Sequence, residues 1–212
     1  MILRSLFAAV LLCTVSCQSA YYATMERFGV DKREILVDRV ENARGSQEDA
    51  KDQFQTTLDA FQALTGFDGG ELEDLYDDLK GEYDDSVDAA EDVRDEIAGV
   101  EDVATAMFEE WESEIEEITD PKLRSKSTDL LSDTRTRYDG LVRLMNSAAA
   151  GMDPVLEQFK NNVLFLKHNL NARAIDSLKD TTLEIQGEVA DLIRRMQNSI
   201  EEADRFIESM DS

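Results

Sequence analysis

Residues 72–118 read LEDLYDDLKGEYDDSVDAAEDVRDEIAGVEDVATAMFEEWESEIEEI, and this stretch decides the fold. Apolar and small residues recur along it in alternating steps of four and three, with one lapse at Glu114. Such a seven-residue repeat is typical of helices that coil around one another. The repeat predicts a helix about 70 Å long, because each residue adds about 1.5 Å. Its positions are Leu72, Tyr76, Leu79, Tyr83, Ser86, Ala90, Val93, Ile97, Val100, Ala104, Met107, Trp111 and Ile118.

The same periodicity continues on both sides of this stretch. Pro and Gly number only two and ten in 212 residues, so little interrupts a helical chain. The positions before the stretch are Leu36, Val40, Ala43, Gln47, Ala50, Phe54, Thr57, Phe61 and Leu64. Those after it are Leu123, Leu130, Thr134, Tyr138, Leu141, Met145, Leu156, Phe159, Val163, Leu166, Leu170, Leu178, Ile185, Val189, Leu192, Met196, Ala203, Phe206 and Met210.

Helix boundaries are also encoded. Acidic N-cap residues and prolines at first helical positions mark helix starts, and glycines mark helix ends. These signals predict four antiparallel helices near residues 31–65, 70–119, 121–150 and 153–210, joined by short turns. The signals are Asp31 with Glu34, Gly66, Asp68 with Glu71, Asp120-Pro121, Gly151 and Asp153-Pro154.

The last helix has one irregular point. Its core positions step from Leu170 to Ala174 to Leu178, two steps of four in succession. A stutter or a break would both explain this, and we expect a continuous or gently kinked helix. The predicted fold is all-α: an elongated antiparallel coiled coil or bundle of about four long helices.

The N-terminus resembles a bacterial export signal. Met1 to Arg4 form a short positive start, Ser5 to Val15 an apolar run, and Ser16-Cys17 a cleavage site that leaves a cysteine first. The run is too short to span a bilayer, which takes about twenty residues. We therefore expect residues 1–16 to be removed, Cys17 to be lipidated, residues 17–30 to form a tether and residues 31–212 to form one helical domain.

Two other interpretations of the N-terminus stay open. Thr14 stands where a lipoprotein signal usually has leucine. An ordinary secretory signal cut near Ser16 or Ala20 would leave a soluble periplasmic protein, and an uncleaved signal would act as an anchor.

Charge excludes one large class of partners. Without residues 1–16 the chain has 47 acidic residues against 21 Lys and Arg, a net charge of −26. Such a chain is repelled by phosphate backbones, so no nucleic-acid partner is expected. Residues 68–120 hold 23 of the acids and only two bases, whereas residues 121–150 carry a net charge of +3. The acidic helix is therefore either a solvated face, partly offset by its basic neighbour, or a docking strip for a cationic partner.

Catalytic and metal-binding signatures are missing from the sequence. His168 is the sole histidine, and Phe165 occupies the position where a di-iron bundle would need glutamate. Asp68-Gly-Gly-Glu71 lacks the ligand spacing of a calcium loop. We expect no enzyme activity, no cofactor and no specific metal site.

One segment differs from the rest of the chain. No acidic residue occurs between Glu157 and Asp176, and residues 161–173 are apolar on more than one helix face and rich in Asn. The segment is either a helix buried in the bundle centre, with Asn residues fixing register, or a surface that binds a partner. The candidate interaction surface consists of Lys167, His168, Asn169, Asn171 and Arg173.

Several phrases resemble an uncharacterised bacterial family catalogued as a domain of unknown function, number 2959. They are Tyr21-Tyr22 with Met25-Glu26, residues 32–39 (KREILVDR), residues 67–70 (FDGG), Glu110-Trp111-Glu112 and residues 164–173 (LFLKHNLNAR). The resemblance implies a secreted or lipid-anchored helical protein of Gram-negative bacteria. It implies no activity, substrate or catalytic residue.

Together these observations predict a periplasmic, lipid-anchored structural or adaptor coiled coil, held to the outer membrane through Cys17, that presents an acidic interaction surface to an unknown protein partner. The alternative is a carrier, similar to a holdase, that binds an apolar or cationic ligand in its bundle. Seven-residue seams are self-complementary, so the sequence also allows a homodimer.

Overall fold

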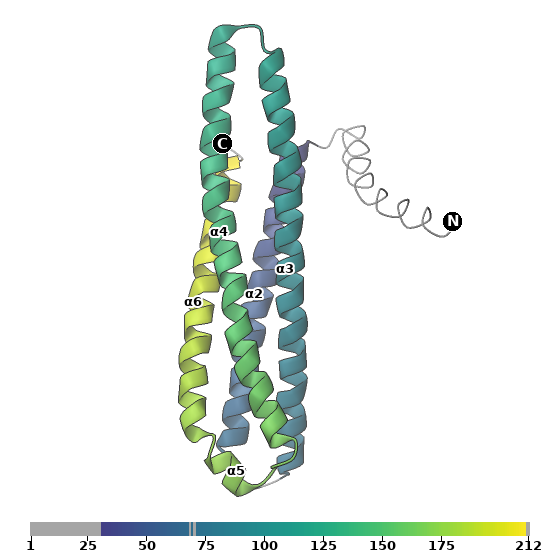
Figure 1. Ribbon diagram of the computed structural model, residues 1–212, viewed down its shortest axis with the longest axis vertical. Coiled ribbons are helices and arrows are strands. Elements are labelled where there is room, and N and C mark those ends of the chain that lie inside the picture. The colour runs from purple at the N-terminus through teal and green to yellow at the C-terminus, as the bar shows by residue number, and fades with distance from the viewer. Residues whose placement is uncertain (1–30, 68, 70, 211–212) are drawn as a thin grey trace, which may run out of the picture.

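The computed structural model describes residues 31–67, 69 and 71–210, and these form an elongated antiparallel helical bundle (Figure 1). Its helices are α2 (Lys32–Thr65), α3 (Leu72–Glu117), α4 (Pro121–Leu166), α5 (Ala172–Asp176) and α6 (Lys179–Met210). The predicted all-α fold of about four long helices is confirmed. The predicted signal of residues 1–16, Cys17 and the predicted tether of residues 17–30 lie outside the described residues.

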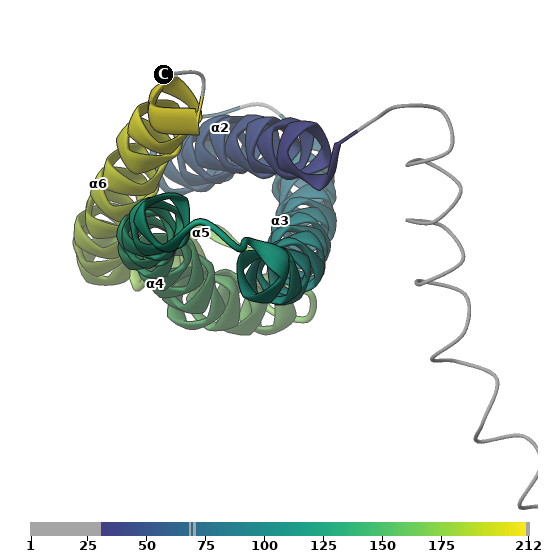
Figure 2. The same cartoon turned by 90° about the horizontal axis from the view of Figure 1, so that it is seen from above.

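The four long helices surround one apolar core. Helix α2 packs against α3 and α6, and α4 packs against the same two helices, so the order around the bundle is α2, α3, α4, α6. Figure 2 shows this arrangement along the long axis. Every repeat position predicted in residues 36–64 is buried in α2, and every one predicted in residues 185–210 is buried in α6.

Two of the predicted N-caps are present. The carboxylate of Asp31 accepts a hydrogen bond from the Arg33 amide, and that of Asp120 accepts from the amides of Lys122 and Leu123. Helix α3 instead begins after Glu71, which makes no side-chain capping bond. Asp68, predicted to cap this helix, lies outside the described residues.

The predicted division of the second half of the chain is wrong. Helix α4 runs through Gly151 and Pro154 to Leu166, and the break falls at residues 167–171. A proline inside a helix costs about 3 kcal/mol or more. The buried side chains of Met152 and Val155, on either side of the proline, keep the helix packed along the apolar core of the bundle. Gly151 is a packing residue, since a Cβ there would lie 3.3 Å from Leu192 Cδ1 on α6.

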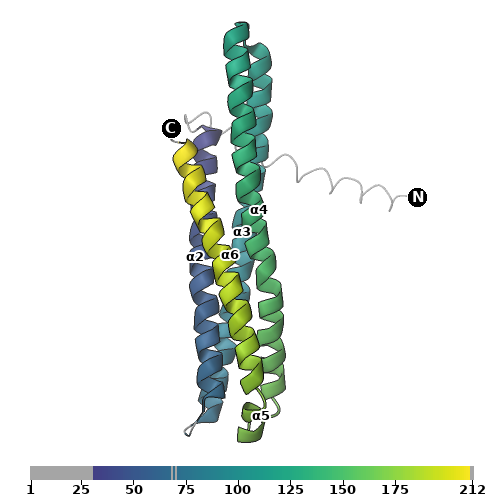
Figure 3. The ribbon, with the colours of Figure 1, turned by 90° about the vertical axis from the view of Figure 1, so that its left-hand side faces the viewer.

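The α3–α4 hairpin extends beyond the other two long helices. In Figure 3 its turn projects past the first residues of α2 and the last residues of α6. We name residues 111–134 the hairpin tip. Leu123 and Leu130, predicted as core positions, are 60% and 50% exposed there. Leu131, next to Leu130, is buried instead, so the buried face of α4 at this level is shifted from the predicted positions. Among the described residues no third helix covers the hairpin tip.

Candidate functional site

The five residues predicted as an interaction surface meet at the opposite end of the bundle, which we name the α5 end. Lys167, His168 and Asn169 follow the last residue of α4, and Asn171 and Arg173 begin α5. All five are exposed. We name these five residues the turn surface. The alternative of a helix buried in the bundle centre is wrong for them, because the chain turns outward here instead of continuing along the core.

The asparagines form this turn. Asn169 donates from Nδ2 to the carbonyl of Phe165 at 2.9 Å, which satisfies an acceptor at the end of α4. Asn171 is the N-cap of α5, and its Oδ1 accepts from the amides of Arg173 and Ala174, both at 3.2 Å. The Asn residues therefore end one helix and start the next, and they do not fix the register of a continuous one.

Large apolar side chains lie near the turn surface. Leu164 and Phe165, in the last turn of α4, are 53% and 41% exposed, and Leu183, in the first turns of α6, is 69% exposed. Helices α4 and α6 are packed neighbours. Exposed large apolar groups beside polar ones are a usual sign of an interaction site. The sequence had signalled Leu164 and Phe165 through their acid-free context, whereas nothing in it marked Leu183.

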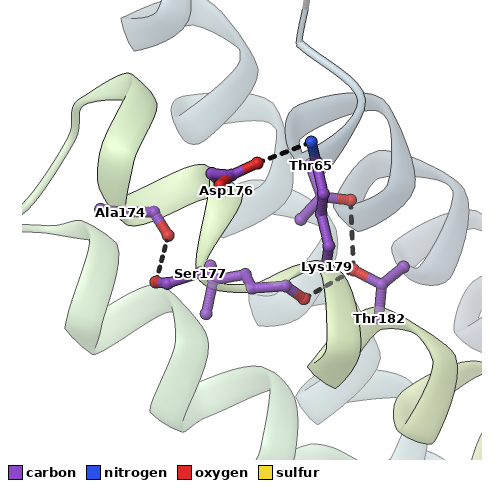
Figure 4. A network of polar contacts seen from close by, with 7 residues as sticks. Thr65, Ala174, Asp176, Ser177, Lys179 and Thr182 are labelled. Atoms are coloured by element: carbon purple, nitrogen blue, oxygen red, sulfur yellow. Dashed lines mark hydrogen bonds and ion pairs between the residues drawn. The ribbon is translucent and has the colours of Figure 1, made fainter.

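Polar contacts attach the turn to the bundle (Figure 4). Ser177 Oγ donates to the carbonyl of Ala174 at 2.6 Å, and Thr182 Oγ1 donates to Thr65 Oγ1 of α2 at 3.3 Å. Lys179 Nζ donates to Asp176 Oδ1 at 2.7 Å and lowers the pKa of that carboxyl. The turn surface is thus carried on a corner that is bonded to the end of α2.

The acidic strip of residues 68–120 corresponds to α3 and its ends. Most of its carboxylates are exposed, and a few bind neighbouring helices. Glu110 pairs with Lys32 Nζ of α2 at 2.9 Å, and Glu112 pairs with Arg135 of α4 at 2.5 Å. Among the described residues, no group of three or more His, Cys, Asp or Glu is arranged to hold a metal ion.

The end of the bundle opposite the α5 end, where α2 begins and α6 ends beside the α3–α4 hairpin, is named the hairpin end. It holds a cavity of about 460 Å³. Its apolar walls are Met107 and Trp111 of α3, Leu130 of α4 and Met210 of α6. Asp31 and Arg33 at the start of α2 and Glu110 and Glu114 of α3 form its polar rim. The indole Nε1 of Trp111 donates to Ser127 Oγ at 2.9 Å, which joins the two helices of the hairpin tip. Sequence patterns did not reveal this cavity, since it arises where two of the four helices end.

Comparison with known proteins gives a family and no activity. Within the described part of the chain, no helix is long and apolar enough to cross a membrane. No curated protein and no solved structure matches the sequence significantly. The model of one family matches residues 21–210, nearly the whole chain. The chain therefore belongs to the family described as Protein of unknown function (DUF2959).

Proposed function

We propose that this protein is a non-enzymatic periplasmic rod, tethered to the outer membrane by lipid on Cys17, that holds a partner-binding surface away from its anchor. The observation that supports the proposal is that Asp31, the first described residue, and the turn surface lie at opposite ends of the bundle. Residues 17–30 precede α2, whose first turn lies at the hairpin end (Figure 1), where Asp31 lines the cavity. The turn surface lies at the α5 end. Helix α2 between them has 34 residues, a length of about 50 Å.

The chemistry of the α5 end supports recognition of a protein. The side chains of Lys167, His168 and Arg173 lie near exposed Leu164 and Phe165 in a segment without acidic residues. The exposed carboxylates of α3 form a second, acidic interaction surface that favours a cationic partner. A partner with an acidic and apolar patch fits the first surface, and a basic segment of the same or another partner fits the second.

The anchor is tested by Cys17→Ala. We expect this change to abolish fatty-acid labelling and to release or mislocalise the protein, because residues 31–210 hold no cysteine that could replace it. Cys13→Ala is the matched control, since Cys13 would leave with the signal. A Cys17→Ala protein that still incorporates labelled fatty acid and stays in the membrane fraction contradicts the proposal.

The turn surface is tested by neutral substitutions in the full chain. Lys167→Gln with Arg173→Gln should leave the circular dichroism spectrum unchanged and remove crosslinks to a partner in cells. Lys122→Gln with Lys126→Gln makes the same charge change at the hairpin end and should leave those crosslinks intact. Loss of helicity in the first variant, or equal crosslinks in both, contradicts recognition at the α5 end.

A second function is favoured by the cavity at the hairpin end. A carrier for an apolar or cationic ligand would use the apolar walls around Trp111 and the carboxylates of Glu110 and Glu114. Clefts of this size commonly hold small ligands. A carrier should bind an apolar dye or copurify with lipid, whereas a spacer should bind neither and keep a fixed length in solution scattering.

A further inference from the structure

The cavity at the hairpin end marks the place where the four-helix bundle loses half of its helices. Helix α2 begins at Lys32 and α6 ends at Met210, while α3 and α4 continue along the hairpin tip. In the hairpin tip Leu130 and Leu123 are 50% and 60% exposed. Elsewhere along the hairpin, α2 packs against α3 and α6 packs against α4. The hairpin tip therefore presents an apolar groove that a further segment of chain could cover.

The chain directly before α2 has the composition that fits this groove. Residues 21–30 read YYATMERFGV, in which Tyr21, Met25 and Phe28 are spaced by four and three residues. That spacing places apolar side chains on one face of a helix. The family match begins at residue 21, so these residues belong to the family's own domain and not to a variable leader.

We propose that the apolar side chains of residues 21–30 fill the groove between α3 and α4 at the hairpin tip. Asp31 and Arg33 themselves line the cavity, so the segment starts at its rim. Phe28 stands three residues before Asp31 and is held within about 11 Å of it, since an extended chain spans at most 3.6 Å per residue. Met25 and Tyr21 reach further, over the exposed side chains of Leu130 and Leu123.

Charge favours this segment over a second copy of the chain as the occupant. Residues 21–30 hold one acid, Glu26, and one base, Arg27, so they add no net charge beside the rim carboxylates of Glu110 and Glu114. A second copy brings a net charge of −25 and is repelled by that of the first. The covalent connection also gives the segment a high effective concentration at the groove.

Docking would shorten the tether. With Tyr21 at the hairpin tip, only four residues remain to Cys17, a reach of about 14 Å when extended. If Cys17 is lipidated, as the proposed function holds, the membrane then lies beside the hairpin tip. The docking itself does not depend on the lipid, so its test can fail while lipidation of Cys17 stands.

Cysteine crosslinking in the full chain tests the contact. Phe28→Cys combined with Leu130→Cys should give an intramolecular product with a short bismaleimide. Phe28→Cys combined with Leu183→Cys at the α5 end is the matched control and should give no product that joins these two positions. Crosslinked dimers in place of the intramolecular product would show that a second copy fills the groove, and they overturn the proposal, as does the absence of any product.

Trp111 provides an independent readout, because it is the sole tryptophan of the chain and lines the cavity. Met25→Ser with Phe28→Ser should shift its emission to longer wavelength and increase its quenching by acrylamide at every protein concentration. Leu183→Ser, which removes an exposed leucine far from Trp111, should change neither. Emission unchanged in the first variant, or changed only by added lipid or dye, overturns the proposal.

Discussion

The helices terminate in different ways at the two ends of this bundle. At the α5 end all four long helices stop together, and α5 with its Asn caps turns the chain across the end. At the hairpin end α2 and α6 stop early, and α3 and α4 continue as a pair with Leu123 and Leu130 exposed. The first end is held by side-chain hydrogen bonds and carries a polar surface, whereas the second leaves large apolar side chains exposed.

Core truncation should separate the two ends most strongly. Phe159 is fully buried near the α5 end and packs edge-on against Phe61, with ring centroids 6.4 Å apart. Phe159→Ala should lower the free energy of unfolding by about 3–5 kcal/mol, because it leaves a cavity in the seam. Leu123→Ala at the hairpin tip should change it by about 0.5 kcal/mol or less. Urea titration followed by circular dichroism measures both, and equal losses would contradict the difference between the ends.

Removal of one N-cap at each end of the bundle should give a smaller difference between the two ends than core truncation does. Asp120→Ala and Asn171→Ala each remove a side chain that accepts from two backbone amides, a loss of about 1 kcal/mol. We expect Asp120→Ala to speed amide exchange only in the hairpin tip, which unfolds locally. Asn171→Ala should also lower the melting temperature, because its turn is bonded to α2 through Thr65. Hydrogen exchange and calorimetry test this. A lower melting temperature for Asp120→Ala, with only local exchange changes for Asn171→Ala, would contradict it.

Alkaline pH should act at the boundary between bundle and hairpin tip. Tyr138 on α4 lies edge-on to Phe108 of α3 and Phe206 of α6, and burial raises the pKa of its phenol to about 12. The folded state therefore favours the neutral phenol. This contribution to stability is complete below pH 10, the ordinary pKa, and is lost as the pH rises towards 12.

Absorbance at 295 nm should resolve Tyr138 as a late-ionising tyrosine, and Tyr138→Phe should remove that late component. The same variant should lose less stability between pH 10 and 12 than the wild type. If wild type and variant lose stability equally over this range, burial of the Tyr138 phenol does not cause the loss of stability at alkaline pH.

The sequence predicted the seam well and the ends poorly, for a physical reason. A seven-residue repeat states which face of each helix is apolar, so the buried positions of α2 and α6 could be identified in advance. It does not state whether another helix covers that face, nor which of two adjacent leucines faces inward. Leu123 and Leu130 were predicted to be buried, but both are exposed and Leu131 is buried. Coverage depends on where other helices begin and end, which is a property of the whole bundle.

Local capping signals were also ambiguous. Asp153-Pro154 resembles a helix start, yet the buried side chains of Met152 and Val155 outweigh the lost hydrogen bond. Asn171 is an equally good N-cap by residue type and is the one the chain uses. The absence of acidic residues located the turn surface in the sequence. That these residues form a turn could not be predicted, because the sequence did not show that a new helix begins at Asn171 and not at Asp153. The cavity had no sequence signal, because its walls come from four different helices.

We propose that attachment and recognition lie at opposite ends of the rod. The most direct measurement places a photo-crosslinking amino acid in growing cells at His168 in one variant and at Lys122 in another. The account predicts a protein adduct from position 168, at the α5 end, and lipid adducts from position 122, at the hairpin end. Lipid adducts from position 168 with protein adducts from position 122, or the same adducts from both, would contradict it.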